Sequence, residues 1–486
     1  MSLFVSRPSC TLGVYLESRE MDQMNEKKIF TGVKQPGNTL KFALIGLPNS
    51  GKSSMFNALT VPVNKQDVDT FLFSTLDVTR ANFYNPDSLL DWYVEIFGSK
   101  QGKGFTSIVA DGPALVENSV HGEGEGIDFL EEYACCDVLI NVVRCFEDEQ
   151  LTHYYETIDP VRDSKIVVQE LLMADLMTIE KRIIELYTEQ DQIVYDMGTV
   201  GKNHKWERWT MLRAWHWLVG CDRLEMPIKG PVRKHQPMPE RCEGSCLRYG
   251  EWNDMEIDFL MQLTLFTTKP MVHVLNVPLR EYTRLRPLWL EPMKHYIDSI
   301  GDDPIISMNM ELEQRFVDRR LDGDVDTYIG ANPTHKSAIP LLAQAVENSL
   351  NMVTFYTGTT PENTPEQIGF IPLPNDNILK AWRCRHGTTA VEAATLVDPD
   401  IARYFNKLTM YARNDLEEEN GHFDRLREFN KERQQQKKYV VGVGDVVQFH
   451  SFDVPKENFK PPKKKKVFEM PKSPKKEKEK EKEKEK

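Results

Sequence analysis

The chain has 486 residues, of which 40% are apolar and 28% charged, as expected for a globular protein of about three domains. Its 61 basic and 74 acidic residues give a formal net charge of −13, which is unevenly distributed. The segment from Pro455 to Lys486 holds 14 lysines and seven glutamates (+7), so the preceding residues carry −20, which excludes a uniformly basic nucleic-acid coat protein.

The composition also limits the compartment. No apolar stretch approaches the roughly 20 residues that span a bilayer, and the broken apolar run at the N-terminus is unlike a signal peptide. The eight cysteines are scattered, and Cys242 and Cys246 form a C-x3-C without a second pair at zinc-finger spacing. We therefore expect reduced thiols, no membrane partner, and a cytosolic or nuclear protein.

Short apolar runs separated by helical patterns predict an α/β fold with a mostly parallel sheet. The run Lys41–Ile45 stops at Gly46 and predicts a buried strand, and Met55–Leu59 continues as a helix. Further strands are predicted at 105–110, 138–143 and 271–275.

A long amphipathic helix is predicted between Val167 and Tyr187. Its apolar positions are spaced 4, 3, 4 and 3 residues apart: Leu172, Leu176, Ile179, Ile183 and Leu186. This seam covers only about two heptads, so we expect an αα-hairpin rather than an intermolecular coiled coil. Four tryptophans follow at helical spacing, and we expect them to pack in a core: Trp206, Trp209, Trp215 and Trp217.

The C-terminal part begins after turn-rich segments. Residues 227–246 predict a surface loop, and the proline-rich stretch 358–377 marks a domain boundary. A strand-like run at 378–384, a helical pattern at 390–394 and an alternation at 439–449 predict a small mixed α/β module. The tail from Pro455 has almost no apolar side chains, so we expect it to be disordered or transiently helical.

The segment from Gly46 to Ser53 (GLPNSGKS) fits the phosphate-binding loop pattern G-x4-G-K-S. It follows an apolar strand and opens a helix, the context in which backbone N–H groups and a helix N-terminus bind phosphate oxygens. Lys52 is expected to neutralise the β- and γ-phosphates, and Ser53 to ligate Mg²⁺. The alternative is an ordinary glycine turn before a helix.

Two more residues are candidates for binding the metal. Thr75, in FSTLD, could reach Mg²⁺ and the γ-phosphate, although many surface threonines have similar neighbours. Asp111 ends a predicted strand, where an acid can hold the metal through water. A buried or capping aspartate is the alternative for Asp111.

From Lys41 to Phe449 the chain resembles the YchF/Obg-like ATPases, a translation-factor-related branch of the P-loop GTPases. The matching segments occur in the family's order: 46–60, 73–77, 122–126 (GEGEG), 144–148 with 151–153, 159–163 (DPVRD), 252–254 with 269–272, and 439–440 with 444–447. The resemblance implies a P-loop G domain, interrupted by an α-helical hairpin and followed by a β-grasp-like TGS domain. The implied divisions are an N-terminal extension (1–38), the G domain (39–150 and 266–352), the helical insert (151–265), the TGS domain (353–454) and the tail (455–486).

The resemblance also implies a function. The family hydrolyses ATP, often in preference to GTP, and associates with ribosomes, so we expect slow Mg²⁺-dependent hydrolysis and a ribosome or RNP partner. The implied nucleotide-binding residues are Asn49, Ser50, Gly51, Lys52, Ser53, Ser54, Asn276 and Val277. Asn49 matches an asparagine that helps hold a monovalent cation in related G domains, so cation dependence is one expectation. We expect a monomer.

The third motif departs from the family pattern. The family has D-x-A-G, whereas this chain has Asp111-Gly112-Pro113-Ala114, so a Cβ stands where a glycine N–H would meet the γ-phosphate. The family's hydrolytic histidine aligns with Val120, one residue before His121. His121 is therefore the candidate for positioning water, and a free surface histidine is the alternative.

The fourth motif departs as well. The family has N-x-x-E, and this chain has Asn276-Val277-Pro278-Leu279. Leu279 cannot accept from guanine, whereas the Asn276 amide oxygen can accept from the adenine amine, which favours ATP or loose selectivity. Together these departures motivate an alternative function: a pseudo-NTPase that holds nucleotide as a scaffold with little turnover.

The basic tail contains Pro461–Val467 (PPKKKKV), which has the form of a nuclear-import signal. Polybasic segments also bind RNA and other acidic partners electrostatically. We therefore expect a cytoplasmic protein whose tail contacts RNA, importin or another acidic partner. The alternative is a solvated tail that only maintains solubility.

Overall fold

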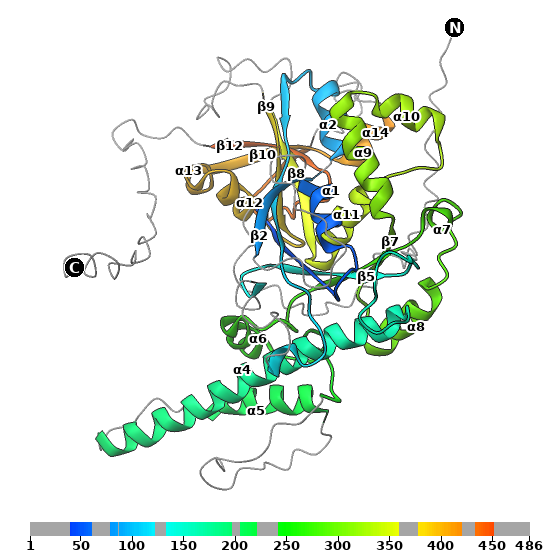
Figure 1. Ribbon diagram of the computed structural model, residues 1–486. Coiled ribbons are helices and arrows are strands. Elements are labelled where there is room, and N and C mark those ends of the chain that lie inside the picture. The colour runs from blue at the N-terminus through cyan, green and yellow to red at the C-terminus, as the bar shows by residue number, and fades with distance from the viewer. Residues whose placement is uncertain are drawn as a thin grey trace, which may run out of the picture.

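The computed structural model describes residues 39–60, 78–85, 87–121, 133–196, 205–220, 242–358, 378–419 and 433–451, which form two six-stranded sheets with their helices (Figure 1). Several predictions fall outside these residues: the N-terminal extension, Thr75, the segment 122–126, the boundary at 359–377 and the tail. Within the described part, no helix is long and apolar enough to cross a membrane.

The first sheet has the order β2-β4-β1-β5-β6-β7 and confirms the predicted α/β class. All neighbours are parallel except β2, which runs antiparallel to β4. Its strands are β1 (Lys41–Ile45), β2 (Thr79–Tyr84), β4 (Thr106–Asp111), β5 (Val138–Arg144), β6 (Met271–Asn276) and β7 (Ile305–Met308). The predicted strands at 41–45, 105–110, 138–143 and 271–275 therefore exist within one residue at each end.

Helices cover both faces of this sheet, which explains why β5 and β6 are buried along their whole length. Alternate β1 side chains point to opposite faces: Phe42 and Leu44 pack with α1 (Lys52–Thr60), whereas Ala43 and Ile45 pack with α4 (Pro160–Asp196). The α1 face also receives α9 (Met310–Asp322) and α11 (Ile339–Ser349). The sheet margin carries α7 (Leu279–Thr283), α8 (Leu290–Ile300) and α10 (Val325–Ala331).

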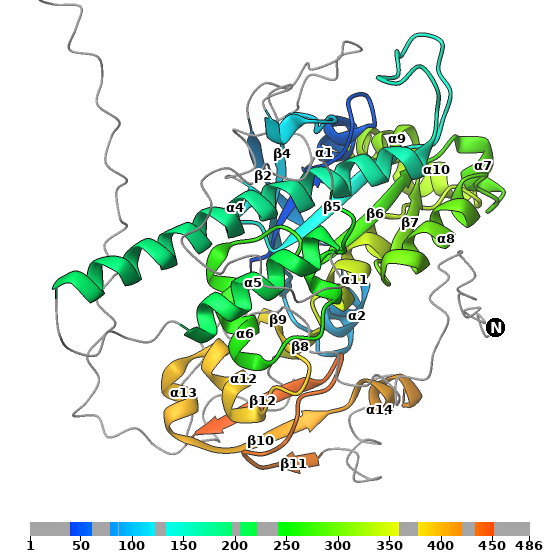
Figure 2. The same ribbon diagram turned by 90° about the horizontal axis from the view of Figure 1, so that it is seen from below.

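The predicted αα-hairpin is formed by α4 and α5 (Lys205–Val219), which pack against each other (Figure 2). The five seam residues from Leu172 to Leu186 are all buried, so the predicted seam is confirmed. The helix is longer than predicted at both ends, and its far end projects beyond the body of the molecule in both views. A short helix, α6 (Asp254–Leu260), packs beside α5.

The tryptophans of α5 correct one prediction. Trp215 is partly buried, but Trp206, Trp209 and Trp217 are 40%, 46% and 37% exposed. Trp206 contacts the ring of Phe259 edge-on, so helical spacing alone could not distinguish a core face from this half-covered one.

The second sheet has the order β11-β10-β12-β8-β9-β3. Its strands are β3 (Gln101–Lys103), β8 (Met352–Thr357), β9 (Ile378–Arg385), β10 (Phe405–Tyr411), β11 (Arg433–Gln435) and β12 (Val446–Ser451), and its helices are α12 (Ala390–Val397), α13 (Pro399–Arg403) and α14 (Arg413–Glu418). The predicted strand at 378–384 and helix at 390–394 are confirmed. The alternation from Tyr439 becomes a strand only at Val446.

One strand of this second sheet comes from within the first domain. Between β2 and β4 the chain forms α2 (Ser88–Ile96) and then β3, which pairs in parallel with β9. The buried rings of Tyr93 and Phe97 pack edge-on against Tyr356 and Tyr411 of the C-terminal sheet. The Tyr93 hydroxyl also donates a 2.7 Å hydrogen bond to the carbonyl of Gly444. The two domains are therefore joined by shared secondary structure.

Candidate nucleotide-binding site

The loop from Gly46 to Ser53 connects the end of β1 to the start of α1. Gly46 has φ +146°, and a Cβ there would lie 2.4 Å from the carbonyl oxygen of Val142. Gly51 has φ +105°, and a Cβ there would lie 2.5 Å from Nδ2 of Asn276. Both positions therefore require glycine, first because of the backbone conformation and second because of the close neighbours.

Lys52 is buried inside this loop. Its Nζ donates to the carbonyls of Gly46 and Leu47, at 3.3 and 3.0 Å. Burial lowers the pKa of Lys52 from 10.5 to about 8, and the opposing charge of Asp111 offsets only part of that shift. The structure thus places a buried titratable amine inside the loop, where it donates to two backbone carbonyls.

Ser53 and Asp111 meet beside Lys52. Ser53 Oγ donates a 2.7 Å hydrogen bond to Oδ2 of Asp111, which ends the strand next to β1. Burial raises the pKa of Asp111, whereas the Ser53 hydrogen bond and the Lys52 charge lower it. Its Oδ1 has no hydrogen-bond partner among the described residues. A hydroxyl and a carboxylate with an unpaired buried oxygen are the hard ligands that Mg²⁺ prefers, so these residues fit the predicted metal.

The segment after Asp111 lies across the phosphate loop. The N–H of Leu115 donates to the carbonyl of Gly46 at 3.2 Å. Gly112 leaves room for Tyr133, since a Cβ there would lie 2.3 Å from the Tyr133 hydroxyl. Ala114 is buried between Gly112, which packs closely on Tyr133, and the hydrogen-bonded Leu115. A γ-phosphate in the loop would therefore meet a segment that is closely packed before Ala114 and hydrogen-bonded to the loop after it.

The strand end of β6 brings Asn276 and Val277 to the loop. Asn276 Nδ2 donates to the carbonyl of Ser50 at 3.1 Å, and its Oδ1 accepts from the N–H of Met310 at 3.4 Å. Val277 is buried, and its carbonyl accepts from the side chain of Asn309 at 2.7 Å. Asn276 thus bridges the phosphate loop and the start of α9, and among the described residues its amide oxygen accepts one long hydrogen bond.

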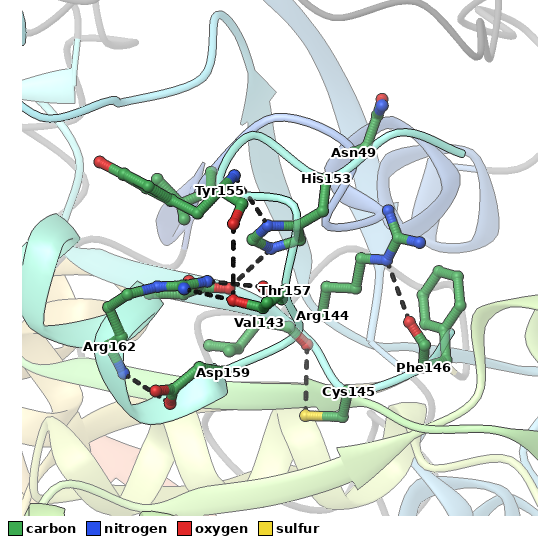
Figure 3. Close-up of polar contacts among 12 residues, drawn as sticks. Asn49, Val143, Arg144, Cys145, Phe146, His153, Tyr155, Thr157, Asp159 and Arg162 are labelled. Carbon is green, nitrogen blue, oxygen red and sulfur yellow. Dashed lines mark hydrogen bonds and ion pairs between the residues drawn. The ribbon is translucent and has the colours of Figure 1, made fainter. Parts of the chain in front are cut away.

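A polar loop after β5 packs against the phosphate loop (Figure 3). Asn49, with φ +57°, donates through Nδ2 to the carbonyl of Thr152 at 3.0 Å. Arg144 donates to the carbonyls of Phe146 and Leu151, both at 3.1 Å. The family-like strings 144–148 and 151–153 therefore act locally as a brace for the loop that carries Asn49.

The brace is tied to α4 through His153. Its Nε2 lies 2.9 Å from Oδ2 of Asp163, and its Nδ1 accepts from the N–H of Tyr155 at 3.1 Å, so Nε2 carries the proton (Figure 3). Asp163 also pairs with Arg162 at 2.9 Å. The first turn of α4 is thus connected through His153 to the loop beside Asn49.

A small cavity lies behind the phosphate loop, between these residues. Three buried polar atoms on its wall have no hydrogen-bond partner in the described part of the chain: Ser50 Oγ, Asn141 Oδ1 and Arg144 Nη1. The space suits about one water molecule, which polar walls of this kind stabilise.

The remaining predicted residues are placed only in part. His121 ends a one-turn 3₁₀ helix, Ser119–His121, and its side chain lies outside the described part. The preceding segment is fixed, since Asn118 and Val120 donate their N–H groups to the carboxylate of Glu170 at 2.8 and 3.0 Å. Ser54 lies half-buried on α1. Sequence reasoning missed Glu170, because a glutamate within a long amphipathic helix has no distinguishing pattern.

Two family models match the chain. A model described as a 50S ribosome-binding GTPase matches residues 41–173, and the C-terminal domain model of YchF GTPases, described as a protein of unknown function, matches residues 374–451.

Relatives match over nearly the full length. Obg-like ATPase 1 of Bos taurus is 30% identical over 455 residues, covering 91% of this chain and 100% of the relative. The Homo sapiens protein of the same name is 29% identical with the same coverage. Among solved structures, the YchF GTPase of Schizosaccharomyces pombe aligns with a TM-score of 0.62 and 24% identity, over 85% of this chain and 98% of that one. That likeness concerns the fold.

Proposed function

This chain belongs to the YchF/Obg-like ATPase family, and we propose that it binds ATP or GTP with Mg²⁺ and hydrolyses it slowly, as a ribosome-associated switch. The observation that carries the proposal is the placement of Ser53 and the unpaired Oδ1 of Asp111 beside the buried ammonium of Lys52. These groups supply metal ligands and a cation next to a backbone built to surround phosphate.

Each residue has a proposed role. Lys52 exchanges its contacts with Gly46 and Leu47 for phosphate oxygens, since a charged acceptor makes the stronger hydrogen bond. Ser53, Thr75 and Asp111 hold the metal, Asp111 through water. The metal, when bound, neutralises the charge that develops on the phosphates.

Three further residues are proposed to contact the nucleotide base, the attacking water and a monovalent cation. Asn276 accepts from the adenine amine through Oδ1, and Leu279 offers no acceptor for guanine, so we propose a preference for ATP. His121 positions the attacking water. Asn49 contributes its amide oxygen to a monovalent cation, which a comparison of turnover in K⁺ and Na⁺ tests.

The test compares Lys52→Ala with Lys181→Ala, a charge-matched change at an exposed position on α4. ATP and GTP binding and single-turnover hydrolysis are measured for both and for the wild type. We expect Lys52→Ala to lose binding and turnover, and Lys181→Ala to keep both. Absence of nucleotide binding by the wild type would contradict the proposal.

A scaffold function is the second candidate, supported by the methyl group of Ala114 and by Leu279. Tight nucleotide binding by the wild type without turnover dependent on Lys52 would favour it.

Ribosome association is tested separately, by comigration with ribosomal subunits over a salt series. We place the protein in the cytoplasm as a monomer and assign nuclear import to 461–467. A fluorescent fusion with and without residues 455–486 tests the import.

A further inference from the structure

A basic, apolar projection follows the nucleotide-binding strand β6. It consists of α7 and the turn that leads to Trp289, and we call residues 279–289 the α7 loop. Its exposed side chains are Arg280, Arg284, Leu285, Arg286 and Leu288. The α7 loop lies at the margin of the molecule, on the side opposite the far end of α4 in both views (Figures 1 and 2).

The shape of the α7 loop is fixed by hydrogen bonds. Glu281 holds it twice: its carbonyl accepts from the N–H of Arg286 at 3.2 Å, and its carboxylate accepts from the N–H of Leu288 at 2.9 Å. The buried Tyr282 donates its hydroxyl to the carbonyl of Lys336 at 2.7 Å. The backbone that carries the exposed side chains is therefore held in a defined conformation.

Two leucines project from this surface into solvent. Leu285 is 50% exposed and has φ +54°, a conformation that costs an L-residue with a Cβ about 1–2 kcal/mol. Leu288 is 71% exposed. Neither exposure nor left-handed backbone stabilises the free protein at these positions, and such strain is concentrated at functional sites.

The positive charges of the three arginines are not paired with acidic side chains of the described residues. No ion pair or side-chain hydrogen bond is made by Arg280, Arg284 or Arg286 within the described residues, and the Glu281 carboxylate is turned to the backbone. Three other exposed arginines, Arg315, Arg319 and Arg413, each pair with an acid on the same surface. The exposed Arg320 and Arg403 make no ion pair within the described residues either, but they lie singly, whereas the α7 loop groups three such arginines within seven residues. The α7 loop therefore has a free positive charge on a body of net charge −20.

We propose that the α7 loop is the surface by which this protein docks on RNA in the ribosome. The guanidinium groups bind consecutive phosphates, and Leu285 and Leu288 contact the sugar and base faces between them. This inference rests on the ribosome association proposed above. RNA is favoured because its evenly spaced phosphates suit three unpaired guanidinium forks, and because a body of −20 repels RNA except where positive charge is concentrated.

The α7 loop lies close in the chain to the proposed base-binding residues. Only Pro278 separates it from Asn276 and Val277, so an RNA contact there lies near both of them in the chain. The proposed RNA contact and the proposed base-binding residues therefore lie on one short segment of chain.

The experiment measures binding of the full chain to protein-free ribosomal RNA and to intact ribosomal subunits, over a salt series. The first variant combines Arg280→Gln, Arg284→Gln and Arg286→Gln. Its matched control combines Arg315→Gln, Arg319→Gln and Arg413→Gln, which removes the same charge from paired positions. A third variant combines Leu285→Ala and Leu288→Ala, and thermal melts check that all variants fold.

The salt dependence distinguishes the roles of these residues. Each phosphate contact contributes about 0.7–0.9 to the slope of log affinity against log salt, so we expect the first variant to reduce that slope by about 2–3. The control should leave the slope unchanged, and the leucine variant should weaken binding with the slope preserved. All variants keep the Lys-rich tail, so its contribution to the slope cancels when their slopes are compared.

Three results would overturn the inference. The first is an equal loss of RNA affinity in the arginine variant and in its control. The second is an absence of wild-type affinity for protein-free RNA. The third is arginine-dependent binding to subunits alone, which would identify a ribosomal protein as the partner. Retained ATP binding without subunit binding would remove the ribosome role and leave the NTPase function intact. Loss of ATP binding would instead concern the proposed function.

Discussion

Asn276 donates its side-chain amide to the carbonyl of Ser50 at 3.1 Å, and so ties the end of β6 to the phosphate-binding loop. The contact joins residues that are more than 200 positions apart in the chain. The side chain that we propose for base binding therefore also supports the phosphate-binding loop.

Replacing Asn276 by alanine tests its support of the phosphate-binding loop and its proposed contact with the base. We expect Asn276→Ala to weaken ATP binding about tenfold, or ~1.4 kcal/mol, because the loop loses its support and the base its acceptor. Inorganic tripolyphosphate, which has no base, should lose less affinity. Titration calorimetry with both ligands measures the difference, and equal losses would show that Asn276 acts on the loop alone.

Nucleotide binding should take up a proton near pH 8.5. Burial lowers the pKa of Lys52 to about 8, so a large fraction of its amine is neutral at that pH, and phosphate raises the pKa again. Calorimetry in buffers of different ionisation enthalpy measures the uptake, which should vanish below pH 7. Lys52→Arg should abolish it, because a guanidinium stays protonated. Buffer-independent heats for the wild type at pH 8.5 would contradict the assignment.

Restoring the family's glycine should accelerate hydrolysis. Ala114 is buried on the segment anchored to Gly46 through Leu115, and Ala114→Gly removes the methyl group that we propose hinders the approach of a γ-phosphate to its N–H. We expect the single-turnover rate to rise roughly tenfold, which corresponds to about 1.4 kcal/mol of transition-state stabilisation. Ala331→Gly, at the exposed end of α10, controls for added flexibility. An unchanged rate would mean that Ala114 does not limit turnover.

Glu313 should make stability depend on pH. This buried carboxylate on α9 accepts from Ser337 Oγ at 2.7 Å and from the N–H of Ala338 at 2.6 Å, yet burial raises its pKa from 4.5 to about 7. The folded state therefore holds the proton more tightly than the unfolded chain, and the stabilisation present below pH 4.5 is lost as pH rises through 7.

Glu313→Gln keeps the side chain neutral and should remove this contribution. We expect the variant to gain up to about 3 kcal/mol over the wild type between pH 5 and pH 8, measured by urea unfolding. A constant difference between the two proteins across that range would refute the assignment to Glu313.

The sequence predicted the nucleotide-binding sheet well because its signals are local. Apolar runs ending at turn residues placed β1, β5 and β6, and the G-x4-G-K-S spacing placed Lys52 and Ser53. Contacts such as Ser53 with Asp111 followed, because adjacent parallel strands end at the same edge of a sheet.

The remaining features depend on tertiary contacts that leave no local pattern. β3 has the sequence QGK, which has neither periodicity nor strand propensity, and its partner β9 is more than 250 residues away. The exposed tryptophans of α5 share their helical spacing with core residues. The roles of Glu170 and His153 depend on what the long helix α4 packs against.

The sharing of the C-terminal sheet has a mechanical consequence. The α2–β3 segment leaves the nucleotide-binding sheet at β2 and returns to it at β4, whose last residue is Asp111. A force on the C-terminal sheet is thus transmitted along covalent chain to the strand that ends at the proposed metal site. Cutting the protein at residue 352 would leave Tyr93 and Phe97 without their covering rings, so the isolated first part would expose these two aromatic side chains.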